Sequence, residues 1–337
     1  MIQGTLGEVK RKTIYFTAPR QVEICEESLP ALGADEVLVE TLCSAISAGT
    51  EMLIYRGQFP HLADAHDDLS SDLRYPLSYG YASVGRIKDT GTQVDKSLLD
   101  KLVLGFQPHT THFSARMDSL LPVPASLPAE ACCFLPNMET AVNLVQDAAP
   151  ILGERVLVLG QGVIGLLVTS LLNEFPLETL VTADWYELRR KASQAIGIKT
   201  SFDPNAKDRP ALNQNKFDLT FELSGSPSAL DDAIGLTAFS GRILIGSWYG
   251  EKRTPIDLGG VFHRSRIKLI SSQVSTIAPE LSGRWDKARR FEVAWQALKR
   301  IQPQKWITHR FPIEDASKAY ELLDQNPQET IQILITY

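Results

Sequence analysis

The sequence has few cysteines and no surplus of positive charge. Its 337 residues include 4 cysteines, and none of them forms a C-x-x-C pair. We therefore expect no disulfide framework, a reducing cytoplasmic location, and thiols that serve as small buried side chains. The 34 Lys and Arg are outnumbered by 40 Asp and Glu, which gives a formal charge of -6. A general nucleic-acid binder would carry the opposite sign, so we expect no nucleic-acid partner.

Long uninterrupted apolar runs are also missing. The longest apolar stretch, residues 156–172, contains Gly160, Gln161, Gly162 and Gly165, and it predicts a strand, a turn and a helix rather than a bilayer span. The first 20 residues hold no apolar segment of signal-peptide length, so we expect neither export nor a membrane partner. Repeats and low-complexity tracts are absent, and the 44% hydrophobic and 22% charged residues are typical of globular proteins.

The length predicts about two domains, and the residue patterns of the two parts of the sequence differ. The first third has short runs of β-forming residues at 13–16, 22–25 and 36–44, separated by Pro, Gly and Asp. From about Met138, apolar strands alternate with helix-length segments, which is typical of a parallel sheet. The predicted strands lie near 155–159, 179–183, 217–222, 242–246 and 267–272, followed by helices near 286–301 and 314–325 and a final strand at 331–336.

The glycine-rich turn is the strongest local signal. The run Gly160-Gln161-Gly162-Val163-Ile164-Gly165 follows an apolar strand and opens an apolar helix. The first glycine permits the tight turn, the second lets a pyrophosphate approach the backbone, and the third lets helix and strand pack closely. The helix N-terminus would add unpaired N–H groups for the phosphates. The alternative is a glycine turn that binds nothing.

An acidic residue follows this turn at the end of the next strand. Asp184 is placed to accept hydrogen bonds from an adenosine ribose and to repel a ribose 2′-phosphate, which favours NAD over NADP. Arg189 and Arg190 complicate this preference, because a guanidinium can bind a phosphate. We include Arg189 among the cofactor-binding candidates.

Three further stretches, together with the glycine turn, resemble the medium-chain dehydrogenase/reductase superfamily: SAISAGTE at 44–51, GYASVG at 80–85 and DLTFELSG at 218–225. The resemblance implies an α/β protein in which a β-rich, GroES-like catalytic domain (1–140 and 275–337) surrounds a doubly wound Rossmann domain (141–274). The active site would lie in the cleft between them. The first two stretches look like the bacteriochlorophyllide a dehydrogenase branch.

The zinc ligands of that superfamily are not where the resemblance would place them. Ser47 or Ala48 stands at the position of the cysteine, Tyr81 and Ala82 replace a histidine and a glutamate, and residues 136–140 offer only Glu139. We therefore expect no metal and no zinc, since a zinc site needs about three His, Cys or carboxylate ligands. The stretch between Pro60 and Pro76, which contains His61, Asp64, His66, Asp67 and Asp68, is interpreted as a solvated loop or lid.

Without zinc, hydride transfer needs another group to handle the hydroxyl proton. Tyr81 is the first candidate, although its ring could simply fill the vacated metal space, and Thr50 matches the proton-relay hydroxyl of zinc relatives. His112 and Glu139 are further catalytic candidates, while Ser47, His109 and Trp285 are candidates for binding substrate. The resemblance assigns Thr140 to the nicotinamide, and strand-end positions assign Ser224, Gly225, Gly246, Ser247 and Trp248 to the cofactor. Arg289 and Arg290 are expected on a solvated helix face.

These observations predict a zinc-independent oxidoreductase that transfers hydride between NAD and a bulky, conjugated or ring-attached secondary alcohol or ketone. An NADPH-dependent enone or quinone reductase and a non-catalytic dinucleotide-binding protein remain as alternatives. We also expect a homodimer, because the strand predicted at 267–272 would otherwise leave a sheet edge exposed.

Overall fold

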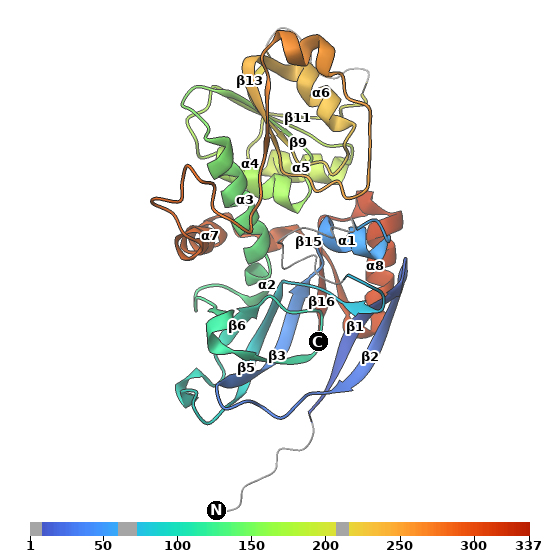
Figure 1. Ribbon diagram of the computed structural model, residues 1–337, viewed down its shortest axis with the longest axis vertical. Coiled ribbons are helices and arrows are strands. Elements are labelled where there is room, and N and C mark those ends of the chain that lie inside the picture. The colour runs from blue at the N-terminus through green and yellow to red at the C-terminus, as the bar shows by residue number, and fades with distance from the viewer. Residues whose placement is uncertain (1–8, 60–72, 207–215) are drawn as a thin grey trace, which may run out of the picture. The chain divides into compact units, whose positions relative to one another are not determined.

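The computed structural model describes residues 9–59, 73–206 and 216–337, and the chain folds as two compact units (Figure 1). Unit 1 comprises residues 1–136, 307–326 and 332–337, and unit 2 comprises residues 137–306 and 327–331. The sequence placed 275–337 in the catalytic domain. Instead, residues 275–306 group with unit 2, because helix α7 (Lys287–Ile301) contacts α4 (Val163–Leu172) and its Arg290 bonds to Glu139.

Unit 1 is built on two sheets. A 3-stranded sheet has the order β2-β1-β4 (Gln21–Ser28, Lys10–Ala18 and Leu77–Ser78). A 7-stranded sheet has the order β15-β16-β3-β5-β6-β8, with β7 paired to β3. Its strands are β15 (Ile307–Pro312), β16 (Gln332–Thr336), β3 (Glu36–Ala45), β5 (Ser83–Thr90), β6 (Leu102–Gly105), β8 (Leu120–Pro122) and β7 (His112–Arg116).

Alternation along β3 explains why the larger sheet has a buried face. Every second residue of Glu36-Val-Leu-Val-Glu-Thr-Leu is buried, which is the period of a strand with one face against a core. Val37 and Val39 pack there with Ile87, Phe113 and Leu120. The last strand, β16, pairs antiparallel with β3, so residues from the two ends of unit 1 share one sheet (Figure 1).

Short helices complete unit 1 within the described residues. They are α1 (Thr50–Tyr55), α2 (Ala129–Cys132) and α8 (Ala316–Gln325). α8 contacts α1 and β2. Tyr320 of α8 is fully buried between Phe16 and Tyr55, whose ring centroids lie 5.1 and 5.6 Å from its own.

Unit 2 has a 6-stranded parallel sheet of order β11-β10-β9-β12-β13-β14, and this confirms the predicted doubly wound arrangement. The strands are β9 (Arg155–Leu159), β10 (Thr179–Ala183), β11 (Thr200–Phe202), β12 (Phe217–Glu222), β13 (Thr237–Ile245) and β14 (Lys268–Ser271). The other helices are α3 (Leu135–Ala148), α5 (Glu187–Ala195) and α6 (Ala229–Leu236).

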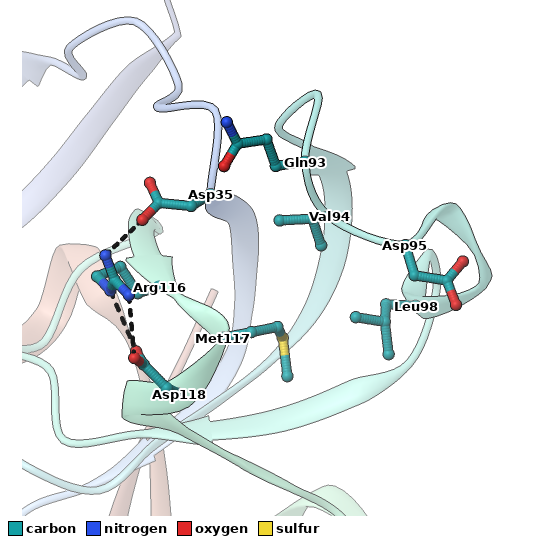
Figure 2. A pocket seen from close by; sticks show the side chains of 8 residues that line it. All are labelled: Asp35, Gln93, Val94, Asp95, Leu98, Arg116, Met117 and Asp118. Atoms are coloured by element: carbon teal, nitrogen blue, oxygen red, sulfur yellow. Dashed lines mark hydrogen bonds and ion pairs between the residues drawn. The ribbon is translucent and has the colours of Figure 1, made fainter.

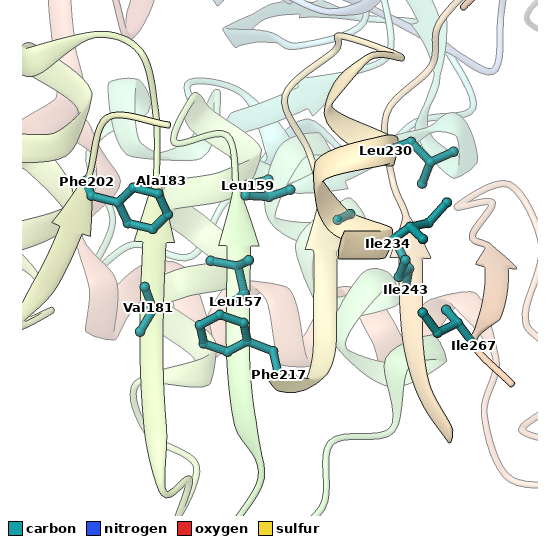
Figure 3. Close-up of a cluster of buried hydrophobic side chains, with 11 residues drawn as sticks. Leu157, Leu159, Val181, Ala183, Phe202, Phe217, Leu230, Ile234, Ile243 and Ile267 are labelled. Carbon is teal, nitrogen blue, oxygen red and sulfur yellow. The ribbon is translucent and has the colours of Figure 1, made fainter. Parts of the chain in front are cut away.

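Continuous apolar strands form the core of unit 2. Residues 156–159 of β9 are all buried, as expected for a parallel strand covered on both faces. Leu157, Val181 and Phe217 of neighbouring strands and Leu230 and Ile234 of α6 belong to one buried hydrophobic cluster (Figure 3). This rigid core presents the carboxyl ends of its strands, which is the edge where open α/β sheets bind ligands.

Candidate active site

The glycine turn in unit 2 connects β9 to α4. Gly160 has φ +91 and takes the left-handed conformation, where a side chain would be strained, and a Cβ there would also lie 2.5 Å from the carbonyl oxygen of Leu223. A Cβ on Gly165 would collide with the carbonyl of Gly160. Gly162 differs, because a Cβ there would meet only a guanidinium nitrogen of Arg189, at 3.9 Å. The open space above Gly162 fits the close approach of a pyrophosphate, as the sequence predicts.

Asp184, which directly follows β10, is hydrogen-bonded to this turn. Its carboxylate accepts hydrogen bonds from the backbone N–H of Gln161 (2.7 Å) and of Tyr186 (2.8 Å). The side chain is 6% exposed, and its Oδ2 lies 4.0 Å from Arg189 Nη1. An acid fixed in this way matches the predicted acceptor for the adenosine ribose.

The two arginines after Asp184 are already engaged. Arg189 donates to the carbonyl oxygens of Pro327 and Thr330, and its guanidinium lies 4.8 Å from the Tyr186 ring centroid. Arg190 donates to the carbonyl oxygens of Asp184 and Trp185. Both guanidinium groups therefore have backbone acceptors, which lessens their value as partners for a 2′-phosphate.

The loops after β12 and β13 meet at a buried carboxylate. Glu222, the last residue of β12, accepts hydrogen bonds from the Ser224 hydroxyl and N–H and from the Tyr249 hydroxyl, the last at 2.5 Å. The Ser247 hydroxyl accepts from the Gly225 N–H at 2.9 Å. The predicted cofactor residues Ser224, Gly225, Gly246 and Ser247 thus lie at the carboxyl edge, and Trp248 follows them in the chain.

In unit 1, three hydroxyl groups gather, two of them at positions where the resemblance places zinc ligands and one where it places a proton-relay hydroxyl. The Tyr81 phenol donates to Ser47 Oγ at 2.6 Å and also hydrogen-bonds the Thr50 side chain. The Thr50 N–H donates to the same Ser47 Oγ at 3.3 Å. Burial is the main cause that raises the pKa of Tyr81 to about 12. We call Ser47, Thr50 and Tyr81 the hydroxyl cluster.

A fully buried carboxyl group and a fully buried imidazole support the hydroxyl cluster. Glu51 accepts from the Ser47 N–H (2.9 Å) and the Tyr320 hydroxyl (2.8 Å), and it pairs with His109 Nε2 at 2.9 Å. His109 Nδ1 lies 2.6 Å from Ser44 Oγ. The imidazole therefore has a partner at each nitrogen and no exposed surface. We correct the prediction that His109 binds substrate, since its contacts make it part of the internal support.

Three other predicted site residues, His112, Glu139 and Trp285, contact residues outside the hydroxyl cluster. His112 projects from β7, where Nδ1 contacts the Thr111 hydroxyl and burial lowers the pKa of the imidazole. Glu139 is paired with Arg290 at 2.7 Å, so its carboxylate has a structural partner rather than a free proton-transfer position. Trp285 belongs to unit 2, and the Arg289 guanidinium lies 4.1 Å from its ring centroid.

The expectation for Arg290 is wrong. Its side chain is 0% exposed, whereas the sequence suggested a solvated helix face. Arg290 falls in the buried stripe of α7 with Ala294, Ala297, Leu298 and Ile301. That helical spacing was a signal that could have identified it.

Several functional candidates were missed because they depend on tertiary contacts. Tyr320 reaches Glu51 from 269 positions along the chain, and Tyr337 reaches Ser44 from 293 positions, with its hydroxyl 2.6 Å from Ser44 Oγ. No local spacing could have indicated either contact. For Glu222, the position at a strand end of a parallel sheet was an available signal.

A surface depression in unit 1 does not coincide with these residues. Its lining includes Val94 and Met117, and Arg116 pairs there with Asp35 and Asp118 (Figure 2). The cation is thus satisfied by neighbours, and the depression includes no member of the hydroxyl cluster. Within the described ranges, no three His, Cys, Asp or Glu side chains are grouped to hold a metal ion. The histidines and aspartates of the proposed lid, at 61–68, lie outside the described residues.

Comparison with known proteins gives full-length matches to dehydrogenases, although no family model matches the chain. D-guloside 3-dehydrogenase from Escherichia coli (strain K12) is 23% identical, with 97% of this chain and 100% of that protein covered. An alcohol dehydrogenase from E. coli, solved with NADH, has a TM-score of 0.77 at 20% identity and covers 98% of this chain and 100% of its own. A dehydrogenase from Sinorhizobium meliloti 1021, described as zinc-binding and solved with NADP, has a TM-score of 0.76 at 15% identity, covering 98% and 100%.

These matches confirm the predicted fold class. None of the helices among the described residues is both long and apolar enough to cross a membrane. The chain has the fold of these alcohol dehydrogenases over nearly its whole length, and the curated relatives that it resembles are dehydrogenases.

Proposed function

We propose that this chain is an NAD(P)-dependent dehydrogenase of the medium-chain type that works without zinc, prefers NAD, and interconverts a ring-attached or otherwise bulky, conjugated secondary alcohol and its ketone. The hydroxyl cluster carries the proposal. Ser47 and Tyr81 offer hydroxyl groups where the resemblance places a thiolate and an imidazole ligand, and Thr50 stands where it places a proton-relay hydroxyl. Hydroxyl groups can move and donate protons, but they are not the N/S donor set that zinc prefers.

Unit 2 supplies the residues that would hold the cofactor. The open backbone at Gly162 fits the pyrophosphate, and the Asp184 carboxylate fits the adenosine ribose. When bound, the nicotinamide supplies the hydride donor or acceptor. A negative carboxylate at Asp184 and engaged guanidinium groups at Arg189 and Arg190 support NAD rather than NADP.

The hydrogen-bond directions in the hydroxyl cluster support Ser47 as the group that donates to substrate. A serine oxygen has two lone pairs and one proton. Ser47 Oγ accepts from the Tyr81 phenol and from the Thr50 N–H, so both lone pairs are in use and its own proton is available. A substrate ketone oxygen would take this proton as hydride arrives, the Tyr81 proton would follow to Ser47, and the half-buried phenol would regain a proton from solvent.

The substrate class rests on two supports. A substrate whose conjugation stabilises charge at the carbinol carbon lessens the need for a metal ion. The relative named D-guloside 3-dehydrogenase acts on a sugar derivative, which agrees with a ring-attached secondary alcohol. An enone reductase would also use a hydroxyl donor, and it is the second candidate for that reason.

Metal content and turnover test zinc independence together. We expect purified protein to oxidise or reduce a cyclic secondary alcohol or ketone with NAD(H) at a rate that chelator treatment leaves unchanged. Elemental analysis should show far less than one zinc per chain. One zinc per chain with activity lost to chelator would overturn the zinc-free mechanism, and turnover of enones alone would favour the second candidate.

Competition between the two cofactors tests the NAD preference. The unaltered protein should bind NADH more tightly than NADPH, and Asp184→Asn should narrow the difference, because the neutral amide keeps an acceptor oxygen for the Gln161 N–H. Asp203→Asn is the matched control, since that half-buried acid follows the neighbouring strand β11 and contacts Arg190 at 3.7 Å. Tighter NADPH binding to the unaltered protein would contradict the proposal.

A further inference from the structure

Arg290 is a buried cation whose every donor is used. A guanidinium has five N–H groups. Nε and Nη2 donate to Glu139 at 3.1 and 2.7 Å, and Nη1 donates to Asn143 Oδ1 at 2.5 Å. The remaining two donors reach the carbonyl oxygens of Thr276, at 3.1 Å, and Val274. Such complete pairing is needed for a side chain with no exposed surface.

These five bonds join three parts of unit 2. Arg290 lies on α7, Glu139 and Asn143 lie four positions apart on one face of α3, and residues 274–276 follow β14. A second set of bonds fixes the start of the same segment, since Asn143 Nδ2 donates to Ser272 Oγ at 2.9 Å. Residues 272–276 are therefore held against α3 at both ends.

The position of residues 272–276 directly after β14 indicates what the segment does. Residues 272–276 leave the carboxyl end of β14, and ligands of open α/β sheets bind outside the carboxyl ends. Asp184 directly follows β10 and the glycine turn directly follows β9, whereas β14 belongs to the other half of the sheet. At about 4.8 Å per strand, β14 is roughly 19 Å from β10, in the half of the sheet away from the predicted adenosine acceptor Asp184.

We infer that Arg290 is a positioning residue for the nicotinamide half of the dinucleotide site, acting by clamping residues 272–276 to α3. The inference rests on the proposed function. Arg290 touches no ligand in this role. Its loss would leave the Asp184 end of the site intact and would release only the far end.

A matched control lies at the amino ends of the strands, opposite their carboxyl ends. Arg242 donates to Glu154 at 2.6 and 2.9 Å and to the carbonyl oxygens of Ala148 and Ala149, so it also clamps α3 through a bidentate ion pair. Glu154 precedes β9, which places this pair at the amino ends of the strands. Removing it should destabilise unit 2 without reaching the cofactor edge.

The experiment measures binding of two probes, NADH and ADP-ribose, to the full chain. ADP-ribose carries the adenosine and both phosphates but no nicotinamide. For Arg290→Met we expect NADH affinity to fall by about tenfold or more and ADP-ribose affinity to change by less than about twofold. Arg290→Lys, with three donors, should recover part of the NADH affinity. Arg242→Met should lower the Tm and leave both affinities unchanged.

The outcomes separate the inference from the proposed function. Equal weakening of both probes by Arg290→Met, or no weakening of either, would overturn the positioning role. If Arg290→Met does not fold by circular dichroism, then Arg290→Lys and Ser272→Ala decide the matter by the same selective loss of NADH affinity. Failure of the unaltered protein to bind either probe would instead overturn the dinucleotide site itself.

Discussion

The phenol of Tyr81 lies between two other hydroxyl groups, and its ring is packed as well. The Tyr79 ring meets it edge-on with the centroids 6.2 Å apart. Two roles for Tyr81, proton donation through Ser47 and the filling of space, can therefore be separated by removing one oxygen atom. The neighbouring Tyr79 provides a control with the same chemical change.

We expect Tyr81→Phe to lower kcat by about 100-fold while leaving the Tm and NADH affinity close to those of the unaltered protein. Ser47→Ala should have a similar effect, and the double variant should be little worse than either single one, because the two groups act in sequence. Steady-state kinetics on a cyclic ketone make the measurement. Tyr79→Phe should retain its kcat, and a Tyr81→Phe enzyme with more than about half the original kcat would show that the phenol only fills space.

Alkaline pH should destabilise the protein through its buried phenols. Burial raises the pKa of Tyr81 to about 12, above its ordinary value of 10.0, and it raises the pKa of Tyr320 as well. Below pH 10 both the folded and unfolded forms keep these protons, so the stabilisation is complete. Above it the unfolded chain ionises first, and the free energy of unfolding falls as pH rises toward 12.

Urea unfolding between pH 9 and 11.5, a range of about one unit below to 1.5 units above the ordinary phenol pKa, measures this loss. Tyr81→Phe should show a shallower decline than the unaltered protein. Tyr186→Phe is the control, since that phenol is partly exposed on the surface of unit 2. An identical decline in all three proteins would contradict the assignment.

At the scale of the element, the β9–α4 turn combines two kinds of glycine. Gly165 is required by packing, because a Cβ would collide with the Gly160 carbonyl, whereas Gly162 has open space above it. The same substitution to alanine therefore tests fold at one position and ligand approach at the other.

We expect Gly165→Ala to lower the Tm sharply and Gly162→Ala to leave it nearly unchanged. Gly162→Ala should nonetheless weaken ADP-ribose binding, because the new methyl group occupies the space of the pyrophosphate. Thermal unfolding and calorimetric titration make the two measurements. Full ADP-ribose affinity in Gly162→Ala would contradict the placement of the phosphates.

Elements with a local signal could be predicted from the sequence. β9, β10 and β12 begin and end where their apolar runs predict, because each is buried on both faces and bounded by turn residues. β11 was missed, since three residues give too short a pattern. β13 starts five positions earlier than predicted, at Thr237, because its first part continues directly from α6.

The candidate site also contains residues that could be predicted from local spacing and residues that could not. The glycine turn and Asp184 could be predicted because sequence spacing fixes their geometry. The partners of Glu51 and Arg290 could not, because Tyr320, His109 and Glu139 approach them from distant parts of the chain. Burial of a charged residue was visible only through its helical spacing with apolar neighbours.

At the scale of the whole molecule, one sheet edge in unit 2 has unpaired backbone groups. Within the described part of the chain, β14 pairs with β13 on one side only. Leu269 on β14 and Phe239 on β13 are 37% and 68% exposed. An exposed apolar edge strand favours pairing with another strand, so the homodimer stays a prediction with this edge as its interface.

We expect a dimer by analytical ultracentrifugation at micromolar concentration, and a shift toward monomer in Leu269→Lys, because an added charge opposes burial of the edge. Leu152→Lys is the control. It places the same charge at a leucine that is 77% exposed elsewhere in unit 2. A monomer in the unaltered protein, or a shift caused equally by both variants, would contradict this interface.

The chain path through the two units also sets an order of synthesis. β3 is made early, but its neighbour β16 is the last strand, and the whole of 137–306 is synthesised between them. As the chain leaves the ribosome, unit 2 has nearly all of its sequence before the large sheet of unit 1 can close. Unit 1 must wait with an open strand edge, so folding in the cell should proceed from the middle of the chain outward, and the nascent first 136 residues are where a chaperone would be needed.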